Sequence, residues 1–132
     1  MPITGERILE VSSKKDKMEG YTHLNVDISI MDVKVEGGDV ELRYQYTANY
    51  EDKIGYITIK GILFAKEERK LAEQIKNEWD RNHRLPEVYA DGILTTINYS
   101  GSVNGTLVAR VLGLAAPYLP QKIQMPKKSD KK

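Results

Sequence analysis

Apolar and polar residues alternate strictly over much of the first half of the chain. From residue 24 every second position is apolar as far as Ile30, and polar residues stand between them. The apolar phase then moves by one position, to Met31, Val33 and Val35. A shift of one residue turns the faces of a strand over unless a bulge absorbs it. The pattern therefore predicts a strand with a bulge or bend at Ile30–Met31.

Two further strands follow, each after a segment typical of a turn. Residues 36–39 contain two adjacent glycines, and alternation resumes from Val40 to Ala48. Residues 49–53 turn the chain again, and residues 54–64 form the next strand. Gly61 lies in the middle of that strand, which indicates a bulge or a close approach of another group. Residues 7–11 are also compatible with a short first strand.

The hydrophobic period changes after residue 65. Leu71, Ile75 and Trp79 recur every fourth position, as on one face of an amphipathic helix. Basic residues follow at 81–84, and Pro86 blocks continuation of the helix. We therefore expect a helix over residues 66–84, with Trp79 either closing the core beneath it or serving as an anchor in a pocket.

Residues 86–114 fit two different structures. Apolar and small residues recur at helical spacing, and Pro86 suits the first turn of a helix. Against this, Asn104-Gly105 is a strong hairpin signal, with strands expected at 93–99 and 107–111. Glycines at 92, 101 and 105 weaken a helix, although they would also let it pack closely against another backbone. The prolines after residue 114 predict an extended arm.

Strands first and helices last predict an α+β domain on an antiparallel sheet. At 132 residues we expect one domain over residues 1–125, followed by a disordered tail over 126–132 that is rich in lysine. Five lysines and one aspartate give residues 122–132 a charge of +4, so a net charge of +1 leaves −3 for the remainder. A slightly acidic body is a poor surface for nucleic acid.

The composition points away from secretion and catalysis. The chain has no cysteine, no signal-peptide pattern at its start and no apolar run long enough for a membrane span, which favours a cytoplasmic protein. Its two histidines, His23 and His83, stand far apart, and there is no phosphate-binding loop. The acidic residues are scattered. We therefore expect no catalytic residues, no metal and no cofactor.

The order of the segments resembles the SecB-type protein-export chaperones. Residues 24–28 and 39–48 are similar to that family's paired strands, and Tyr56–Phe64 resembles its next strand. Residues 85–90 resemble the start of its long helix, and residues 114–124 its Pro-containing exit strand. The resemblance favours the helix over the hairpin for 86–114. It implies a four-stranded antiparallel sheet and a homodimer or homotetramer paired through the long helix, with unfolded polypeptide held in apolar grooves.

This resemblance directs attention to two sets of residues. As groove residues that contact unfolded polypeptide clients we predict Tyr44, Tyr46, Tyr56 and Phe64. The alternative is that these aromatic residues pack beneath the helix of residues 66–84. As the core of the contact between subunits we predict Gly92, Ile93, Ser100 and Leu107.

The chain also departs from the family. The helix over 66–84 is longer than the family's crossover segment, the body is only weakly acidic, and the Lys-rich tail does not resemble the tail that helps to bind the translocation motor. These departures indicate a divergent member, with an archaeal source as one option. A structural or regulatory assembly module with the same fold and no client is the alternative, and an enzyme on a small α+β scaffold is a third hypothesis.

Overall fold

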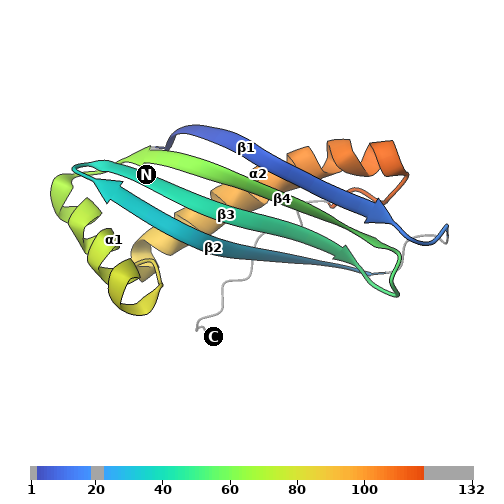
Figure 1. Cartoon of the computed structure of the whole chain (residues 1–132), viewed down its shortest axis with the longest axis horizontal. Coiled ribbons are helices and arrows are strands. Elements are labelled where there is room, and N and C mark those ends of the chain that lie inside the picture. Colours follow the sequence, from blue (N-terminus) through green and yellow to red (C-terminus); the bar gives the residue numbers. More distant parts are fainter. Residues whose placement is uncertain (1–2, 19–22, 118–132) are drawn as a thin grey trace.

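The computed structural model describes residues 3–18 and 23–117, and the predicted tail over 126–132 lies outside them. Four strands precede two helices, in agreement with the predicted α+β class. Figure 1 shows the helices gathered on one side of a long, twisted sheet. The elements are β1 Ile3–Lys15, β2 Leu24–Glu36, β3 Asp39–Tyr50, β4 Gly55–Lys66, α1 Arg69–Asn82 and α2 Glu87–Leu112.

The sheet is antiparallel throughout, in the order β1-β4-β3-β2. Strands β1 and β2 therefore form its two edges. Strand β1 is much longer than the predicted segment 7–11, and pairing along β4 is what extends it. The register of β2 on β3 shifts between Ile30 and Asp32, so Met31 is the predicted bulge. This bulge keeps Ile30 and Val33 on the same, helix-facing side, because it absorbs the shift in apolar phase.

Residues 87–112 form one helix, so the hairpin alternative is wrong and the helix that the resemblance favoured is confirmed. Helix α2 begins after Pro86 and ends at Gly113, which has φ +72° and donates its backbone N–H to the carbonyl of Ala109. Glycine adopts that left-handed conformation without strain. The helix survives its internal glycines because tertiary packing stabilises it more than local propensity weakens it.

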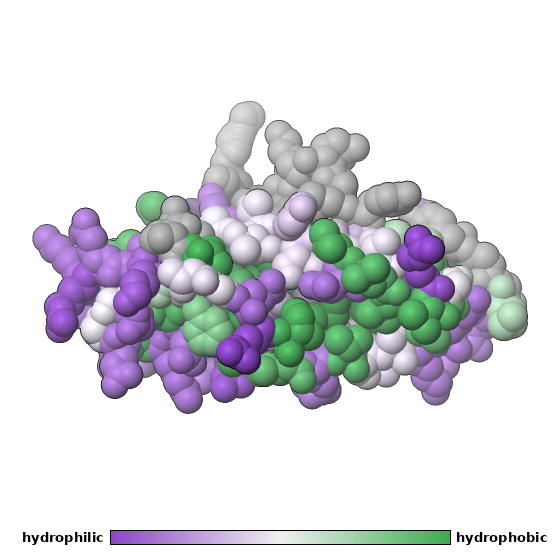
Figure 2. All heavy atoms as spheres, turned by 90° about the horizontal axis from the view of Figure 1, so that it is seen from above, coloured by the Kyte–Doolittle hydropathy of each residue, from purple (hydrophilic) through white to green (hydrophobic). Residues whose placement is uncertain are grey.

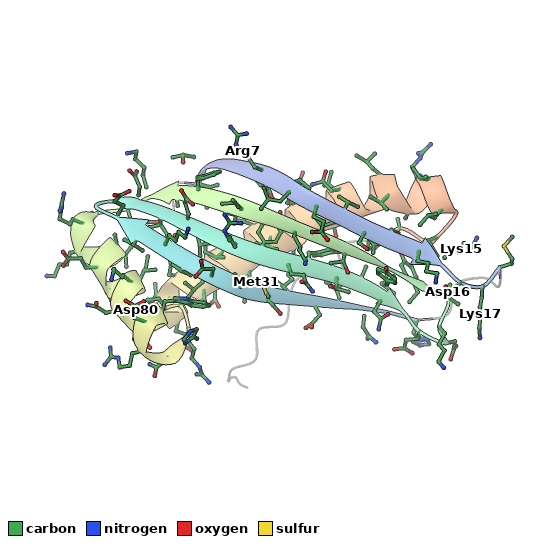
Figure 3. The ribbon with its side chains drawn as sticks, in the orientation of Figure 1. Arg7, Lys15, Asp16, Lys17, Met31 and Asp80 are labelled. Atoms are coloured by element: carbon green, nitrogen blue, oxygen red, sulfur yellow. The ribbon has the colours of Figure 1, made fainter. Side chains whose placement is uncertain are left out.

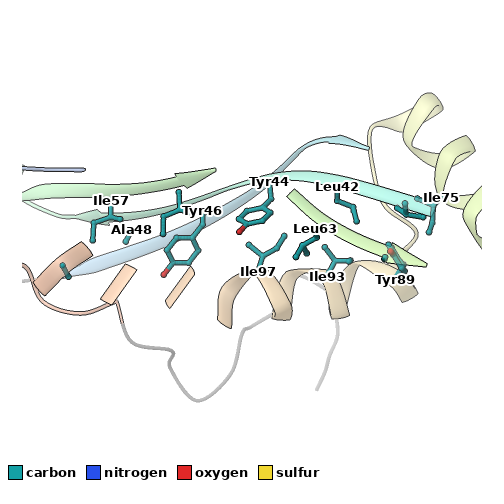
Figure 4. Close-up of a cluster of buried hydrophobic side chains, with 14 of the residues drawn as sticks. Leu42, Tyr44, Tyr46, Ala48, Ile57, Leu63, Ile75, Tyr89, Ile93 and Ile97 are labelled. Atoms are coloured by element: carbon teal, nitrogen blue, oxygen red, sulfur yellow. The ribbon is translucent and has the colours of Figure 1, made fainter. Parts of the chain in front are cut away.

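Helix α2 buries the face of the sheet that carries the alternating apolar residues of β3 and β4. Figure 4 shows side chains of this core between the strands and the helix. The largest completely buried side chains include Tyr44, Tyr46, Leu42, Ile57, Ile59, Leu63, Ile93 and Ile97. Gly101 faces the ring of Tyr46 so closely that a Cβ there would overlap it. Close packing at Gly101 and Gly105 therefore occurs, but against side chains of the same chain and not against another backbone as predicted.

A polar contact joins three elements beside this core. Glu6 of β1 accepts a hydrogen bond from the hydroxyl of Tyr44, and its two carboxylate oxygens share the single hydroxyl proton of Ser100, whose Oγ lies 2.8 and 2.9 Å from them. Gly61 leaves room for Tyr44, because a Cβ at position 61 would lie 2.7 Å from the Tyr44 hydroxyl oxygen. Burial first, and the neighbouring carboxylate second, raise the pKa of Tyr44 above its usual range. The phenol therefore stays protonated and donates.

Helix α1 packs against β2 and buries Ala72, Ile75 and Trp79. Trp79 is only 8% exposed, so its ring is largely buried, although it lies outside the main apolar cluster beneath α2. The helix ends at His83, which has φ 55° and lies with its ring centroid 5.2 Å from that of Trp79. Over the described ranges, neither helix is long and apolar enough to cross a membrane.

Helix α2 crosses the sheet diagonally rather than along a strand. Figure 1 shows its N-terminal end near β2 and its C-terminal end beyond β1. The hydrogen-bond contact of the Ser100 hydroxyl with the Glu6 carboxylate marks the point at which the helix reaches β1. The two ends of α2 consequently lie in different surroundings, and each creates a distinct surface.

Candidate functional site

The N-terminal end of α2 forms a cleft with α1 and the edge strand β2. This α1–α2 cleft has a volume of about 600 Å³. Its apolar lining consists of Ile30, Trp79, Leu85, Ala90 and Leu94. Its polar lining consists of Glu78, His83, Arg84, Glu87 and Asp91. An apolar depression with a charged rim is the usual form of a site that binds apolar groups.

The local sequence explains how the cleft arises. The left-handed residue His83 ends α1, and Pro86 precedes the first turn of α2, so a connection of four residues separates the two helices. Such a short connection holds the helices near each other but leaves a depression where their axes diverge. The depression is lined by Leu85 from the connection and Leu94 from α2, both of which are half-buried.

The cleft adjoins an open edge of the sheet. Strand β2 pairs only with β3, so its other edge carries main-chain groups that no strand pairs with among the described residues. Met31, the bulge residue, is 56% exposed there, and Figure 3 places it on that edge strand. An open edge accepts an extended peptide through main-chain hydrogen bonds, and pockets beside it take alternate side chains.

A second and larger hollow, of about 1110 Å³, has a different character. Eight of its fifteen lining residues are charged, with both signs present, among them Arg7 and Asp80, which Figure 3 labels. Phe64 is one of its five apolar lining residues, against five of the ten residues that line the α1–α2 cleft. A hollow lined in this way suits water and small polar groups better than apolar side chains. The α1–α2 cleft is therefore the stronger candidate for binding apolar groups.

The four predicted groove residues do not share one surface. Tyr44 and Tyr46 point toward α2 and are 1% and 0% exposed, whereas Tyr56 and Phe64 are half-buried on the opposite face of the sheet. Side chains of a strand alternate between faces, and the prediction combined residues of opposite phase. A single groove made of all four is therefore wrong. The core tyrosines pack beneath α2, not beneath α1 as the alternative held.

The four predicted interface residues also separate. Ile93 is fully buried against the sheet of its own subunit, Gly92 is half-buried, and Ser100 is bonded to Glu6. Of the four side chains, only that of Leu107 is largely exposed, at 60%. These residues lie roughly along one stripe of the helix. Because the helix crosses the sheet diagonally, the N-terminal part of that stripe is buried against the sheet and the C-terminal part is exposed. The predicted interface is corrected accordingly: of the four, only Leu107 remains a candidate.

A surface that we call the β1–α2 surface lies where α2 leaves the sheet. Its residues are Ile8, Leu9 and Val11 of β1 with Tyr99, Val103, Leu107 and Val111 of α2. Each is between 39% and 82% exposed. Figure 2, seen from the β1 side, shows apolar side chains gathered over the half of the molecule where α2 ends. Exposed apolar residues that cluster in this way usually mark an interaction surface.

The described residues contain no group of three His, Cys, Asp or Glu side chains placed to hold a metal ion. The sequence drew attention to Trp79 as an anchor but not to Leu85, Ala90 or Leu94. The signal for them was weak, because Leu85 is a single apolar residue between two predicted elements, and Ala90 and Leu94 merely follow Pro86 at helical spacing. That signal does not show which strand they approach.

Comparisons with known proteins find a similar fold but no similar sequence. No protein-family model matches the chain, and no curated protein matches its sequence. Among solved structures, the chain is similar to the Mycobacterium tuberculosis Rv1957 SecB-like chaperone in complex with a ChAD peptide from the Rv1956 HigA1 antitoxin. The TM-score is 0.62 at 9% sequence identity, over 89% of this chain and 84% of the other. Nothing in the comparisons supports an archaeal source, and what they show is that the chain has the fold of a SecB-like chaperone.

Proposed function

We propose that the protein binds unfolded or extended polypeptide in the α1–α2 cleft, as a chaperone that needs no nucleotide and catalyses no reaction. The observation that carries this proposal is the cleft itself, an apolar depression beside an open sheet edge. The fold adds support, because the similar solved structure is a SecB-like chaperone in complex with a peptide. An extended client would pair with β2 and insert apolar side chains against Trp79 and Leu94.

The contacts that the cleft and the adjacent sheet edge offer are enough for weak binding of an extended polypeptide. Burying one large apolar side chain contributes on the order of 2 kcal/mol. Two such side chains, together with several main-chain hydrogen bonds of about 1 kcal/mol each, approach the roughly 8 kcal/mol of a micromolar complex before ordering costs are subtracted. We therefore expect weak binding that is reversible and tolerant of sequence. The rim carries three acidic residues, Glu78, Glu87 and Asp91, against the basic Arg84, and this excess of negative charge favours clients with basic residues near the apolar ones.

We further propose that the protein is a homodimer, or a homotetramer built from such dimers, paired through the β1–α2 surface. A twofold axis would place the exposed apolar side chains of two copies against each other. This surface is separate from the α1–α2 cleft, so pairing would leave the cleft free. A non-catalytic assembly module, with the same pairing but no client, remains the alternative function, and we expect a cytoplasmic protein in either case.

Binding can be followed without a label, because Trp79 is the single tryptophan and lines the cleft. We expect a permanently unfolded, carboxymethylated protein to change the emission of Trp79, with a dissociation constant on the order of 100 µM once ordering costs are subtracted. Leu94→Asp places a carboxylate in the cleft and should weaken binding at least about tenfold, equal to about 1.4 kcal/mol. Val88→Asp is the matched control on the same helix, because Val88 is 95% exposed and outside the cleft.

Two results would remove the proposal. The first is no binding of any unfolded protein by the wild type at concentrations on the order of 100 µM, where even the roughly 5 kcal/mol of a weak complex would be detected. That result would favour the assembly module. The second is equal binding by the Leu94→Asp and Val88→Asp variants, which would place the client elsewhere.

A further inference from the structure

The chain turns back on itself after α2 and runs along the helix toward its N-terminal end. Gly113 reverses the direction, and the backbone N–H of Leu114 donates to the carbonyl of Ala109 at 2.9 Å. The hydroxyl of Tyr50 donates to the carbonyl of Ala115. The carbonyl of Pro117 then accepts a hydrogen bond of 2.7 Å from the Ser102 hydroxyl. By Pro117 the chain has therefore returned about two turns along α2, from Ala109 to Ser102.

This returning segment lies on the side of α2 away from β1. Ser100 points to Glu6 of β1, and Ser102, two positions on, lies about 200° around the helix on the opposite side. Pro117 is completely buried there, with its ring against Gly105. One turn further toward the N-terminal end, on that same side, lies Asn98, and the cleft residues Leu94 and Asp91 follow. The chain at Pro117 is thus directed toward the cleft.

Asn98 provides an independent indication that this side of α2 is a binding surface. It is only 5% exposed, yet its side-chain nitrogen Nδ2 has no hydrogen-bond partner among the described residues. An unpaired buried donor costs on the order of 1–3 kcal/mol, so such donors normally have an acceptor. Ser102, one turn away, donates to the backbone of the returning segment. Asn98 stands where the next carbonyls of an extended chain would pass.

The sequence after Pro117 has the length and pattern to fill the path. The helix rises about 22 Å between Ser102 and Glu87, and eight extended residues span about 26 Å. Residues 118–125 supply those eight, with Leu119, Ile123 and Met125 on one face of an extended chain. Lysines follow at 127, 128, 131 and 132, and would emerge beside the acidic rim residues Glu87 and Asp91, since Glu78 already lies 3.8 Å from Arg81. Length, apolar pattern and charge all match.

We propose that residues 118–125 bind along this side of α2 and occupy the α1–α2 cleft as an internal ligand. In this arrangement Asn98 donates to a carbonyl near Leu119, and Ile123 and Met125 pack against Leu94 and Trp79. A client then has to displace the chain's own C-terminal segment, which makes the segment a built-in competitor. That consequence rests on the proposed function, whereas the docking of residues 118–125 does not.

A disulfide test in the full-length chain addresses the docking directly, because the protein has no cysteine of its own. The pair Ala90→Cys and Ile123→Cys joins a residue that lines the cleft to the predicted docked residue. The control pair Val88→Cys and Ile123→Cys uses the same turn of α2, but Val88 is 95% exposed. We expect the first pair to form an intramolecular disulfide at least about tenfold faster under mild oxidation, given the steep dependence of bridging on Cβ separation. Equal rates, or intermolecular products alone by mass spectrometry, would overturn the proposal.

A second measurement separates docking from client binding. In the full chain, Ile123→Asp with Met125→Asp should release the segment, so that the emission of Trp79 moves to longer wavelength and acrylamide quenching of Trp79 increases about twofold, because water replaces apolar neighbours. An unchanged Trp79 signal counts against docking. If docking is shown but no unfolded protein binds to either form, the internal ligand stands and the chaperone proposal fails. If clients bind equally well to both forms, the segment is not their competitor.

Discussion

Replacing Tyr44 and Tyr46 together by serine is expected to unfold the protein. Both rings are essentially inaccessible, and they fill the space between β3 and α2. Removing one buried aromatic ring typically costs about 3–5 kcal/mol, because the loss of apolar burial adds to the cavity that is left. Two such losses come close to the roughly 5–15 kcal/mol that stabilises a typical domain. The Tyr44→Ser change also leaves Glu6 without one of its donors.

Urea denaturation followed by circular dichroism measures this effect, with each single variant beside the double one. Tyr99→Ser is the matched control, because Tyr99 is 62% exposed on α2 and its loss should cost less than about 1 kcal/mol. A double variant that keeps its unfolding midpoint but no longer binds clients would contradict the core assignment. In that case the tyrosines of β3 would be groove residues after all.

The strands of the first half could be predicted because one face of each is buried and the other is not. The apolar shift at Met31 even located a bulge, since no other backbone arrangement keeps Ile30 and Val33 on the same face. Strand β1 was predicted too short, because its exposed edge position leaves Ile8 and Val11 with little of the burial that creates a pattern. Its pairing with β4 is a long-range contact that no local signal encodes.

The second half was ambiguous for a different physical reason. Gly101 and Gly105 weaken a helix in isolation, yet here they are the positions at which α2 meets Tyr46 and Pro117. Local propensity therefore disfavours a helix here, whereas tertiary packing favours it and contributes more to stability. Only the resemblance to a known family supplied the long-range information that favoured the helix.

The candidate site was the least predictable part. Its lining comes from β2, the end of α1, the connection and the start of α2, and the contact between these segments depends on how the helices cross the sheet. The same crossing angle decides that Ile93 is buried while Leu107 is exposed, although both belong to one stripe of the helix. Periodicity predicts which residues share a stripe, but it does not predict where along that stripe the sheet ends.

Disrupting the β1–α2 surface is expected to convert the proposed oligomer into a monomer. In Val103→Asp with Leu107→Asp, two carboxylates enter the centre of the exposed apolar cluster. In a twofold pair each change occurs twice, so four charges would lose water or hold the subunits apart. We expect the dissociation constant to rise by more than about 100-fold, equal to roughly 3 kcal/mol. Multi-angle light scattering across a range of concentrations around 10 µM reports the change as a loss of molar mass.

Val88→Asp is the control for this experiment as well, because Val88 is 95% exposed at the other end of α2 and outside the β1–α2 surface. Its molar mass should equal that of the wild type. The fold itself should survive the double change, since Val103 and Leu107 are 47% and 60% exposed and the contact of Glu6 with Tyr44 and Ser100 is left intact. A wild type that is already monomeric at these concentrations would show that the exposed apolar residues do not pair two copies. The surface would then need a different partner, and the α1–α2 cleft would have to bind clients as part of a single subunit.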